Sequence, residues 1–216
     1  MVVALVVVGG TLVRGFGDNR RDDAATAHRR QSPVLGGCGA AAFFSLFKSI
    51  LIMTSFATCD LCDEHKNDTD GDFRVLPPVF KDYGRKLKFS GQVSTVKCFE
   101  DNTLVKAAVD SPGHGRVLVV DGGASLRRAL VGGNLGKAAA KNGWAGVLVD
   151  GCVRDSAELA ECDVGIRALG LMPLPTEKRQ EGQSDVAVQV QGVWVRPGDW
   201  LYADEDGIVL SSRPLI

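Results

Sequence analysis

Two short runs rich in Val and Leu, residues 116–120 and 145–149, most constrain what this chain can fold into. Runs of this length and composition are typical of strands buried on both faces of a parallel sheet. Residues 135–142 lie between them and are rich in Ala and Lys, which favours a helix. A strand, a helix and a second strand in this order predict a βαβ unit with a right-handed crossover.

The predicted fold class is α/β, a single compact domain with a central βαβ unit and a strand-rich C-terminal part. The first strand is expected to end in a turn at Asp121-Gly122-Gly123. The other expected elements are a helix over 59–64 with Thr58 as its N-cap, a strand within 88–99 with a bulge at Gly91, helices over 102–109 and 156–162, a strand over 164–169, and short strands over 186–190, 193–195, 200–203 and 208–211.

The first 52 residues are a different kind of sequence. Their two apolar runs, residues 2–8 and 40–53, are each shorter than the ~20 residues that a membrane-spanning helix needs. A secretory signal carries positive charge before its apolar run, and no positively charged side chain precedes the first run here. We interpret residues 1–52 as an N-terminal extension, either for targeting or absent from the mature protein, and residues 53–216 as the functional domain. The expected location is cytoplasmic, with organellar targeting left open and no stable membrane insertion.

The charge of the predicted domain argues against nucleic acid as a partner. The whole chain has 25 basic and 26 acidic side chains, of which residues 1–52 contribute six and three. Residues 53–216 therefore carry 19 basic and 23 acidic side chains, a net charge of −4. Proteins that bind phosphate backbones do so through clustered Lys and Arg, which this balance does not favour.

The candidate site begins with two glycines, Gly132 and Gly133, directly before the predicted helix. The first amides of a helix have no partner within it and lie at the positive end of its dipole, so they can bind a carboxylate. Arg154 and Asp155 follow the second strand of the unit, and ligands of open α/β sheets bind at that end. The guanidinium matches a carboxylate, and the Asp can hold a hard cation through oxygen. The alternatives remain a simple turn at the two glycines, and a surface pair or a helix cap at Arg154 and Asp155.

Several motifs extend this pattern over the whole predicted domain, and with them residues 53–216 resemble the RraA-like family. That family includes class II 4-hydroxy-4-methyl-2-oxoglutarate aldolases and the regulator of ribonuclease activity A. The motifs are Thr58-Cys59-Asp60-Leu61-Cys62-Asp63, residues 121–129 (DGGASLRRA), Gly132 to Leu135, residues 150–155 (DGCVRD), and Leu201-Tyr202-Ala203-Asp204.

The resemblance implies a divalent-metal-dependent carbon–carbon lyase that releases pyruvate from 2-oxo acids. The substrate would be 4-hydroxy-4-methyl-2-oxoglutarate, oxaloacetate or both. Asp155 would hold Mg²⁺ or Mn²⁺, Arg154 and Asp155 would be catalytic, and the subunits would form a homotrimer with sites at their interfaces. The residues implied to bind the pyruvoyl part of the substrate are Gly132, Gly133, Asn134, Leu135 and Arg154.

One position departs from the family pattern. The aldolases carry an Asp 21 residues before the Arg, and this chain has Gly133 there. The proton that quenches the enolate would then come from Asp150, a metal-bound water or a neighbouring subunit. Arg127 or Arg128 is a further candidate for the anionic site.

The alternative function is a non-catalytic regulator that binds and inhibits a ribonuclease or RNA helicase assembly, which would have no use for Asp155. A methyltransferase is disfavoured, because no GxGxG loop follows the first strand.

Overall fold

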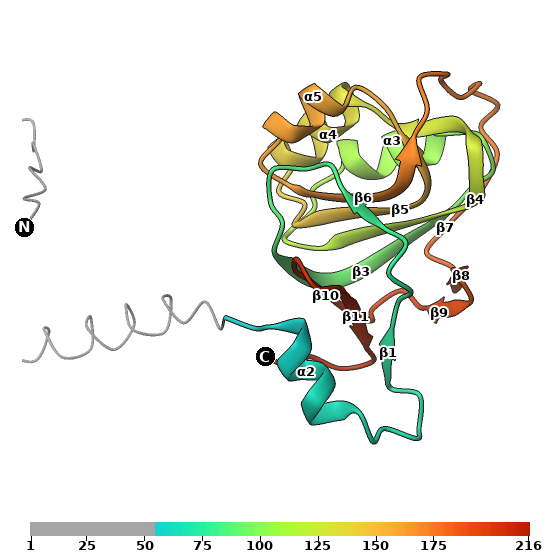
Figure 1. Cartoon of the computed structure of the whole chain (residues 1–216). Coiled ribbons are helices and arrows are strands. Elements are labelled where there is room, and N and C mark those ends of the chain that lie inside the picture. The colour runs from blue at the N-terminus through green and yellow to red at the C-terminus, as the bar shows by residue number, and fades with distance from the viewer. Residues whose placement is uncertain (1–54) are drawn as a thin grey trace, which may run out of the picture. The chain divides into compact units, whose positions relative to one another are not determined.

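The computed structural model describes residues 55–216 (Figure 1). The chain divides into two units, residues 1–52 and 53–216. The predictions for residues 1–52 lie outside the described residues. Within residues 55–216, no helix is long and apolar enough to cross a bilayer.

A helix and three strands open the described chain, helices and strands then alternate from Thr103 to Leu171, and strands alone follow. In chain order the elements are α2 (Thr58–His65), β1 (Phe73–Val75), β2 (Lys81–Asp82), β3 (Phe89–Lys97), α3 (Thr103–Asp110), β4 (Val117–Val131), α4 (Gly133–Lys141), β5 (Gly146–Val153), α5 (Ser156–Glu161), β6 (Gly165–Leu171), β7 (Gln183–Ser184), β8 (Val188–Val190), β9 (Val193–Val195), β10 (Trp200–Ala203) and β11 (Ile208–Ser211).

Most strands belong to one curled sheet in the order β1-β11-β10-β3-β4-β5-β6-β2. Strands β3 to β6 are parallel, whereas β10, β11 and β1 pair antiparallel. The β4-α4-β5 segment is the predicted βαβ unit, and the predicted α/β class is confirmed. The predicted helices and strands within residues 102–211 are found within a few residues of their expected bounds, apart from the end of the first strand.

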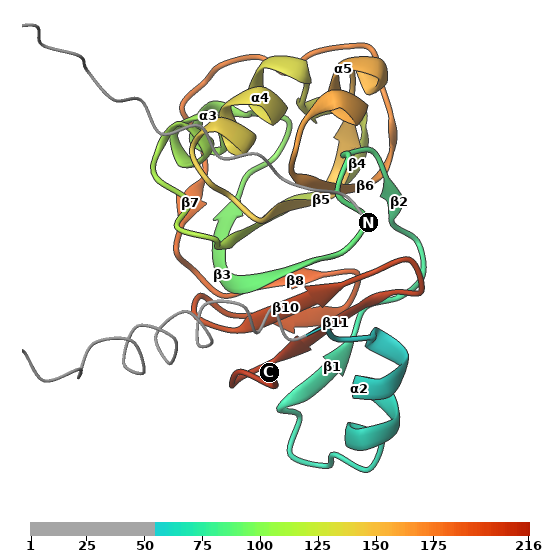
Figure 2. The same ribbon diagram turned by 90° about the vertical axis from the view of Figure 1, so that its left-hand side faces the viewer.

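The sheet separates two apolar cores, and β4 contributes to both. Leu118 and Val120 pack toward the helices, while Val117 and Val119 pack into the second core with Leu201. Figures 1 and 2 show α3, α4 and α5 together on one side of β4, β5 and β6, and β8 to β11 on the other side. Burial on both faces explains why these strands are continuous apolar runs rather than alternating ones.

Helix α2 covers the outer face of β10 and β11, where Phe56 and Leu61 pack on Tyr202. The prediction of Thr58 as N-cap was wrong, because the N-cap is Ala57. The Thr58 hydroxyl instead donates to Asp204 Oδ1 at 2.5 Å, and its amide donates to Oδ2 at 2.7 Å. This pair of bonds explains how Asp204 can be buried at 4% exposure.

Two local predictions about glycines were also wrong. The chain does not leave the sheet at Asp121-Gly122-Gly123, since β4 continues to Val131 with shifts of register against β5. Gly91 makes no bulge, since its pairing with Leu201 is regular. Gly91 is needed for close approach, because a Cβ there would lie 2.2 Å from the Gly115 carbonyl oxygen.

Candidate active site

The segments that follow β3, β4, β5 and β6 meet around one cavity at the carboxyl ends of these parallel strands. Its volume, about 210 Å³, is smaller than that of typical drug-sized pockets, so it suits a small ligand. The lining residues are Asn102, Lys106, Ala129, Gly132, Asn134, Leu135, Arg154, Asp155, Pro175, Thr176 and Lys178.

Five of the six predicted site residues line this cavity, and Gly133 does not. Two amides of the predicted carboxylate cradle are already engaged. The Gly133 N–H donates to Asp155 Oδ2 at 3.1 Å, and the Leu135 N–H donates to the Gly132 carbonyl at 2.9 Å. The amides of Gly132 and Asn134 have no hydrogen-bond acceptor within residues 55–216, so these two can meet a ligand.

Asp155 has a left-handed backbone, with φ 57° and ψ 47°. It is the N-cap of α5, yet its side chain makes no bond to that helix. The carboxylate turns instead to the first amide of α4, where the helix dipole favours a negative charge. Asp tolerates this backbone region better than most residues, which fits its place here.

Arg154 lies beside this carboxylate, with its Nε 3.6 Å from Asp155 Oδ2. Its backbone N–H donates to the Val131 carbonyl at 2.9 Å, which fixes the residue at the end of β5. The guanidinium has no hydrogen-bond acceptor within residues 55–216. Its side chain is 40% exposed, so its forked donors are available to a carboxylate or carbonyl oxygen of a ligand.

Gly132 permits this close packing of the two charged side chains. A Cβ there would lie 2.7 Å from Asp155 Oδ2 and 3.2 Å from Arg154 Nε. Real side chains do not approach so closely, so any larger residue would displace the carboxylate or the guanidinium.

The space beside Gly133 is filled by Glu158 of α5. A Cβ on Gly133 would lie 2.4 Å from Glu158 Oε2 and 2.8 Å from its Cβ. Glu158 is bound by Lys137 at 2.6 Å and does not line the cavity. The carboxylate that is absent at position 133 is therefore not supplied to the cavity by its neighbour.

Asp150, the alternative proton donor within the chain, is also outside the cavity lining. Its carboxylate is buried and accepts a hydrogen bond from Gln191 Nε2 at 2.7 Å. Burial raises the pKa of Asp150, and the nearby Asp121 carboxylate adds to the rise. A raised pKa would suit a proton donor, but Asp150 does not line the cavity and so does not contact a ligand there directly.

Lys106 and Lys178 line the cavity and were not found from the sequence. Lys106 lies on α3, which follows the parallel strand β3, and Lys178 lies in the segment that follows β6. Ligands bind at the carboxyl ends of parallel strands, and this rule located Arg154, which comes directly after β5. It points only to the segments after β3 and β6, and does not single out Lys106 or Lys178, because neither comes directly after its strand.

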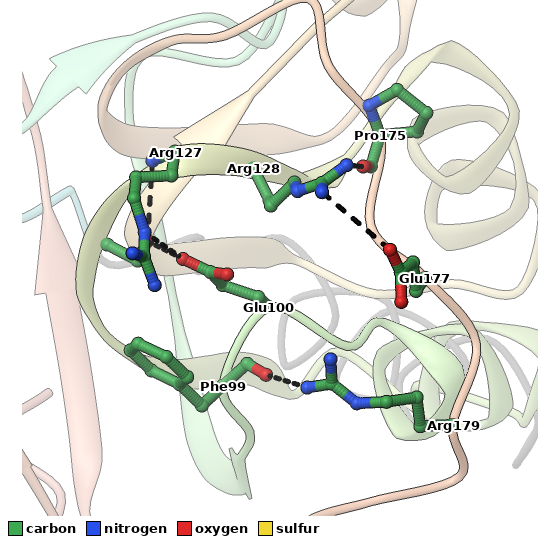
Figure 3. Close-up of polar contacts among 8 residues, drawn as sticks. Phe99, Glu100, Arg127, Arg128, Pro175, Glu177 and Arg179 are labelled. Carbon is green, nitrogen blue, oxygen red and sulfur yellow. Dashed lines mark hydrogen bonds and ion pairs between the residues drawn. The ribbon is translucent and has the colours of Figure 1, made fainter.

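The prediction that Arg127 or Arg128 lines the site was wrong. Figure 3 shows Arg127 paired with Glu100, and Arg128 reaching the Pro175 carbonyl and Glu177. Neither arginine is among the lining residues.

Acidic ligands for a metal are sparse. Within residues 55–216 no three His, Cys, Asp or Glu side chains gather as a metal site, and Asp155 is the one acidic residue that lines the cavity. Its Oδ1 accepts no hydrogen bond within the same residues. A hard oxygen of this kind fits Mg²⁺ or Mn²⁺, and most of the remaining coordination would be water, as Mg²⁺ prefers.

The curled sheet and a cavity lined by basic side chains define an α/β protein with a candidate small-molecule site at the carboxyl ends of its parallel strands. The RraA-like family model, described as Aldolase/RraA, matches residues 58–210, and the chain belongs to this family.

Similar proteins carry three kinds of name. A protein of Albidiferax ferrireducens named "Putative 4-hydroxy-4-methyl-2-oxoglutarate aldolase" is 70% identical over 170 residues, which covers 75% of this chain and 98% of that protein. A protein of the same name from Cupriavidus necator is 56% identical over 73% of this chain and 96% of its own length.

A solved structure described as the RNA-processing inhibitor RraA from Thermus thermophilis has a TM-score of 0.71 and 45% identity, covering 75% of this chain and 96% of that one. Another, described as a 2-dimethylmenaquinone methyltransferase from Geobacillus kaustophilus, has a TM-score of 0.69 and 42% identity, covering 74% and 97%.

Proposed function

We propose that this chain is a carbon–carbon lyase that cleaves 4-hydroxy-4-methyl-2-oxoglutarate, oxaloacetate or both, and releases pyruvate. The observation that carries the proposal is the meeting of Arg154, Asp155 and two unengaged amides in one small cavity. The 70% identity to a protein with an aldolase name supports the same reaction class.

Aldol cleavage and oxaloacetate decarboxylation both need stabilisation of an enolate. Breaking the C3–C4 bond leaves an electron pair that spreads from C3 onto the 2-oxo oxygen as an enolate, and a proton must then be added at C3. In the decarboxylation the C4 carboxylate leaves as CO2. In the aldol case the 4-hydroxyl also loses its proton, and the second product is another pyruvate. Catalysis therefore depends on stabilising charge on one oxygen and on holding the pyruvoyl group in a fixed plane.

The chain provides groups for both tasks. The Arg154 guanidinium can donate to the 2-oxo oxygen, and one charge-assisted bond of this kind is worth about 1.5–3 kcal/mol. The amides of Gly132 and Asn134 can hold the substrate carboxylate at the N-terminus of α4. Asp155 would hold the divalent metal, which when bound supplies Lewis-acid polarisation of the 2-oxo group.

Decarboxylation is the less demanding of the two reactions for this site. It needs no base to begin, whereas the aldol cleavage must remove the hydroxyl proton. Gly133 offers no carboxylate for that step, and Glu158 beside it does not line the cavity. The base for aldol cleavage would be water or a group from a neighbouring subunit of the proposed homotrimer.

The test is pyruvate release from oxaloacetate and from 4-hydroxy-4-methyl-2-oxoglutarate, with and without Mg²⁺ or Mn²⁺. We expect metal-dependent turnover that is lost in Arg154→Ala and Asp155→Ala. The exposed Arg213→Ala and Asp163→Ala provide matched controls, which should retain full activity. A folded protein that releases pyruvate no faster than free metal would refute the lyase and favour the regulatory function suggested by the similarity to an RNA-processing inhibitor.

A further inference from the structure

Helix α2 carries two cysteines that the proposed chemistry does not use. Cys59 is exposed and Cys62 is half-buried, whereas the other three cysteines within residues 55–216 are buried. Figures 1 and 2 show α2 on the side of β10 and β11 away from α3, α4 and α5, and α2 contributes no residue to the lining of the cavity. A role for this pair of thiols is therefore separate from the candidate active site.

The spacing of the two cysteines places both thiols on neighbouring positions of one helix face. Residues i and i+3 of an α-helix have about 5–6 Å between their Cβ atoms. A disulfide needs its Cβ atoms about 3.5–4.5 Å apart, so a direct S–S bond would require α2 to distort. An ion held between the two sulfur atoms spans the longer separation without such a change.

We propose that Cys59 and Cys62 form a two-sulfur site for a soft monovalent cation of the Cu(I) type. Thiolate sulfur is a ligand that selects Cu(I), and this ion is stable with two ligands, whereas structural Zn²⁺ sites take four. Within residues 55–216 no third His, Cys, Asp or Glu completes a larger ligand set with this pair. On binding, two thiols and one Cu(I) give one copper dithiolate and two protons, with no change of oxidation state.

The carboxylates around the pair favour a cation over an oxidant. The Asp206 carboxylate raises the pKa of the Cys59 thiol, and burial adds to the rise. Burial raises the pKa of the Cys62 thiol, and Asp63 and Asp204 raise it further. Protonated thiols are slow to oxidise, because the thiolate is the reactive form. The same negative charges attract a cation.

The start of α2 is anchored to the segment that carries Asp206. The buried Asp204 accepts the amide and the hydroxyl of Thr58, and its Oδ1 also accepts the amide of Asp206 at 3.2 Å. Leu61, on the same helix, packs with Tyr202. This anchoring holds the two thiols and the neighbouring carboxylate in place, so that less ordering is needed when an ion binds.

Competition with the Cu(I) chelator bathocuproine disulfonate, whose copper complex is coloured, tests the site in the full chain without oxygen. We expect the protein to withdraw one Cu(I) per chain from the chelator. Cys59→Ser and Cys62→Ala should each abolish this withdrawal, whereas Cys38→Ser, which removes a different thiol, should retain it. Because Cys59 is exposed, Cys59→Ser keeps the fold, as circular dichroism would check, even if Cys62→Ala lowers the stability.

The outcomes decide the proposal without reference to turnover. Withdrawal of copper that persists in Cys59→Ser overturns it, as does a loss of withdrawal in Cys38→Ser. One Cu(I) shared by two chains, seen as a larger particle in size-exclusion chromatography, also overturns it, because the ion would then join thiols of different chains. Pyruvate release should be equal in Cys59→Ser and wild type, so failure of the copper site and failure of the lyase are observed separately.

Discussion

Asp101 offers the sharpest test of how the cavity is held together. Its side chain is fully buried and accepts three backbone N–H groups from two segments. Burial alone would raise the pKa of this carboxyl, but the hydrogen bonds outweigh it and lower the pKa from 3.8 to about 2. The charged form is therefore the one that the folded state stabilises.

The pKa shift sets the expected magnitude. A fall from 3.8 to about 2 corresponds to about 2 kcal/mol of folding free energy, at about 1.36 kcal/mol per pKa unit. Because the folded pKa is the lower one, this contribution is complete above the unfolded pKa and is lost as the pH falls toward 2. Asp101→Asn, which removes the charge and one acceptor oxygen, should lower the free energy of unfolding by about 2 kcal/mol at pH 7.

Urea unfolding followed by circular dichroism measures this difference. Linkage predicts that the gap between wild type and Asp101→Asn shrinks from about 2 kcal/mol at pH 6 to about 1 kcal/mol at pH 3. Asp163→Asn is the control, because its exposed ion pair with Lys86 should contribute little. A variant within 0.5 kcal/mol of wild type at pH 7, or a gap that does not change with pH, would refute the reasoning.

Three further predictions concern the residues around Arg154. Arg154→Lys keeps the charge but loses the planar fork, and should lower kcat/KM for pyruvate release about 10- to 100-fold; unchanged kinetics would remove Arg154 from the proposed mechanism. Gly132→Ala would place a methyl group against Asp155 Oδ2 and should weaken Mg²⁺-dependent turnover about ten-fold, measured over a range of metal concentrations. Gly133→Ala should destabilise the fold by about 0.5–2.5 kcal/mol in urea, the overlap with Glu158 being partly offset by a less flexible unfolded chain. The cost of Gly133→Ala should fall in a Glu158→Gly background, and an equal cost in both backgrounds would contradict the steric explanation.

The βαβ unit could be predicted because its strands are buried on both faces and therefore consist of continuous apolar runs. The same apolar pattern gave no hint that β4 continues beyond Asp121. The stretch that follows Asp121 begins with two glycines and includes the exposed Arg127 and the half-buried Arg128. It is held in the sheet by pairing with β5, a long-range contact that local composition does not encode.

The candidate site was predictable in part for a related reason. Gly132, Arg154 and Asp155 come directly after strands, so the topology alone brings them together. Lys178 could not be placed in the same way, because its segment is positioned by the buried Asp101, which is far from it in the chain. The engagement of the Gly133 amide by Asp155 was likewise invisible, since it depends on which way one side chain turns.

The left-handed backbone at Asp155 has a consequence for how this site can change over time. Asn and Gly adopt that conformation readily, whereas β-branched residues do not. A single replacement by Asn would remove the negative charge while leaving α5 and the course of the chain intact. The backbone conformation and the side-chain charge at this position can therefore change independently in evolution. A lineage could lose the carboxylate in one step and still pass on a folded protein with the same cavity, free to acquire a different use.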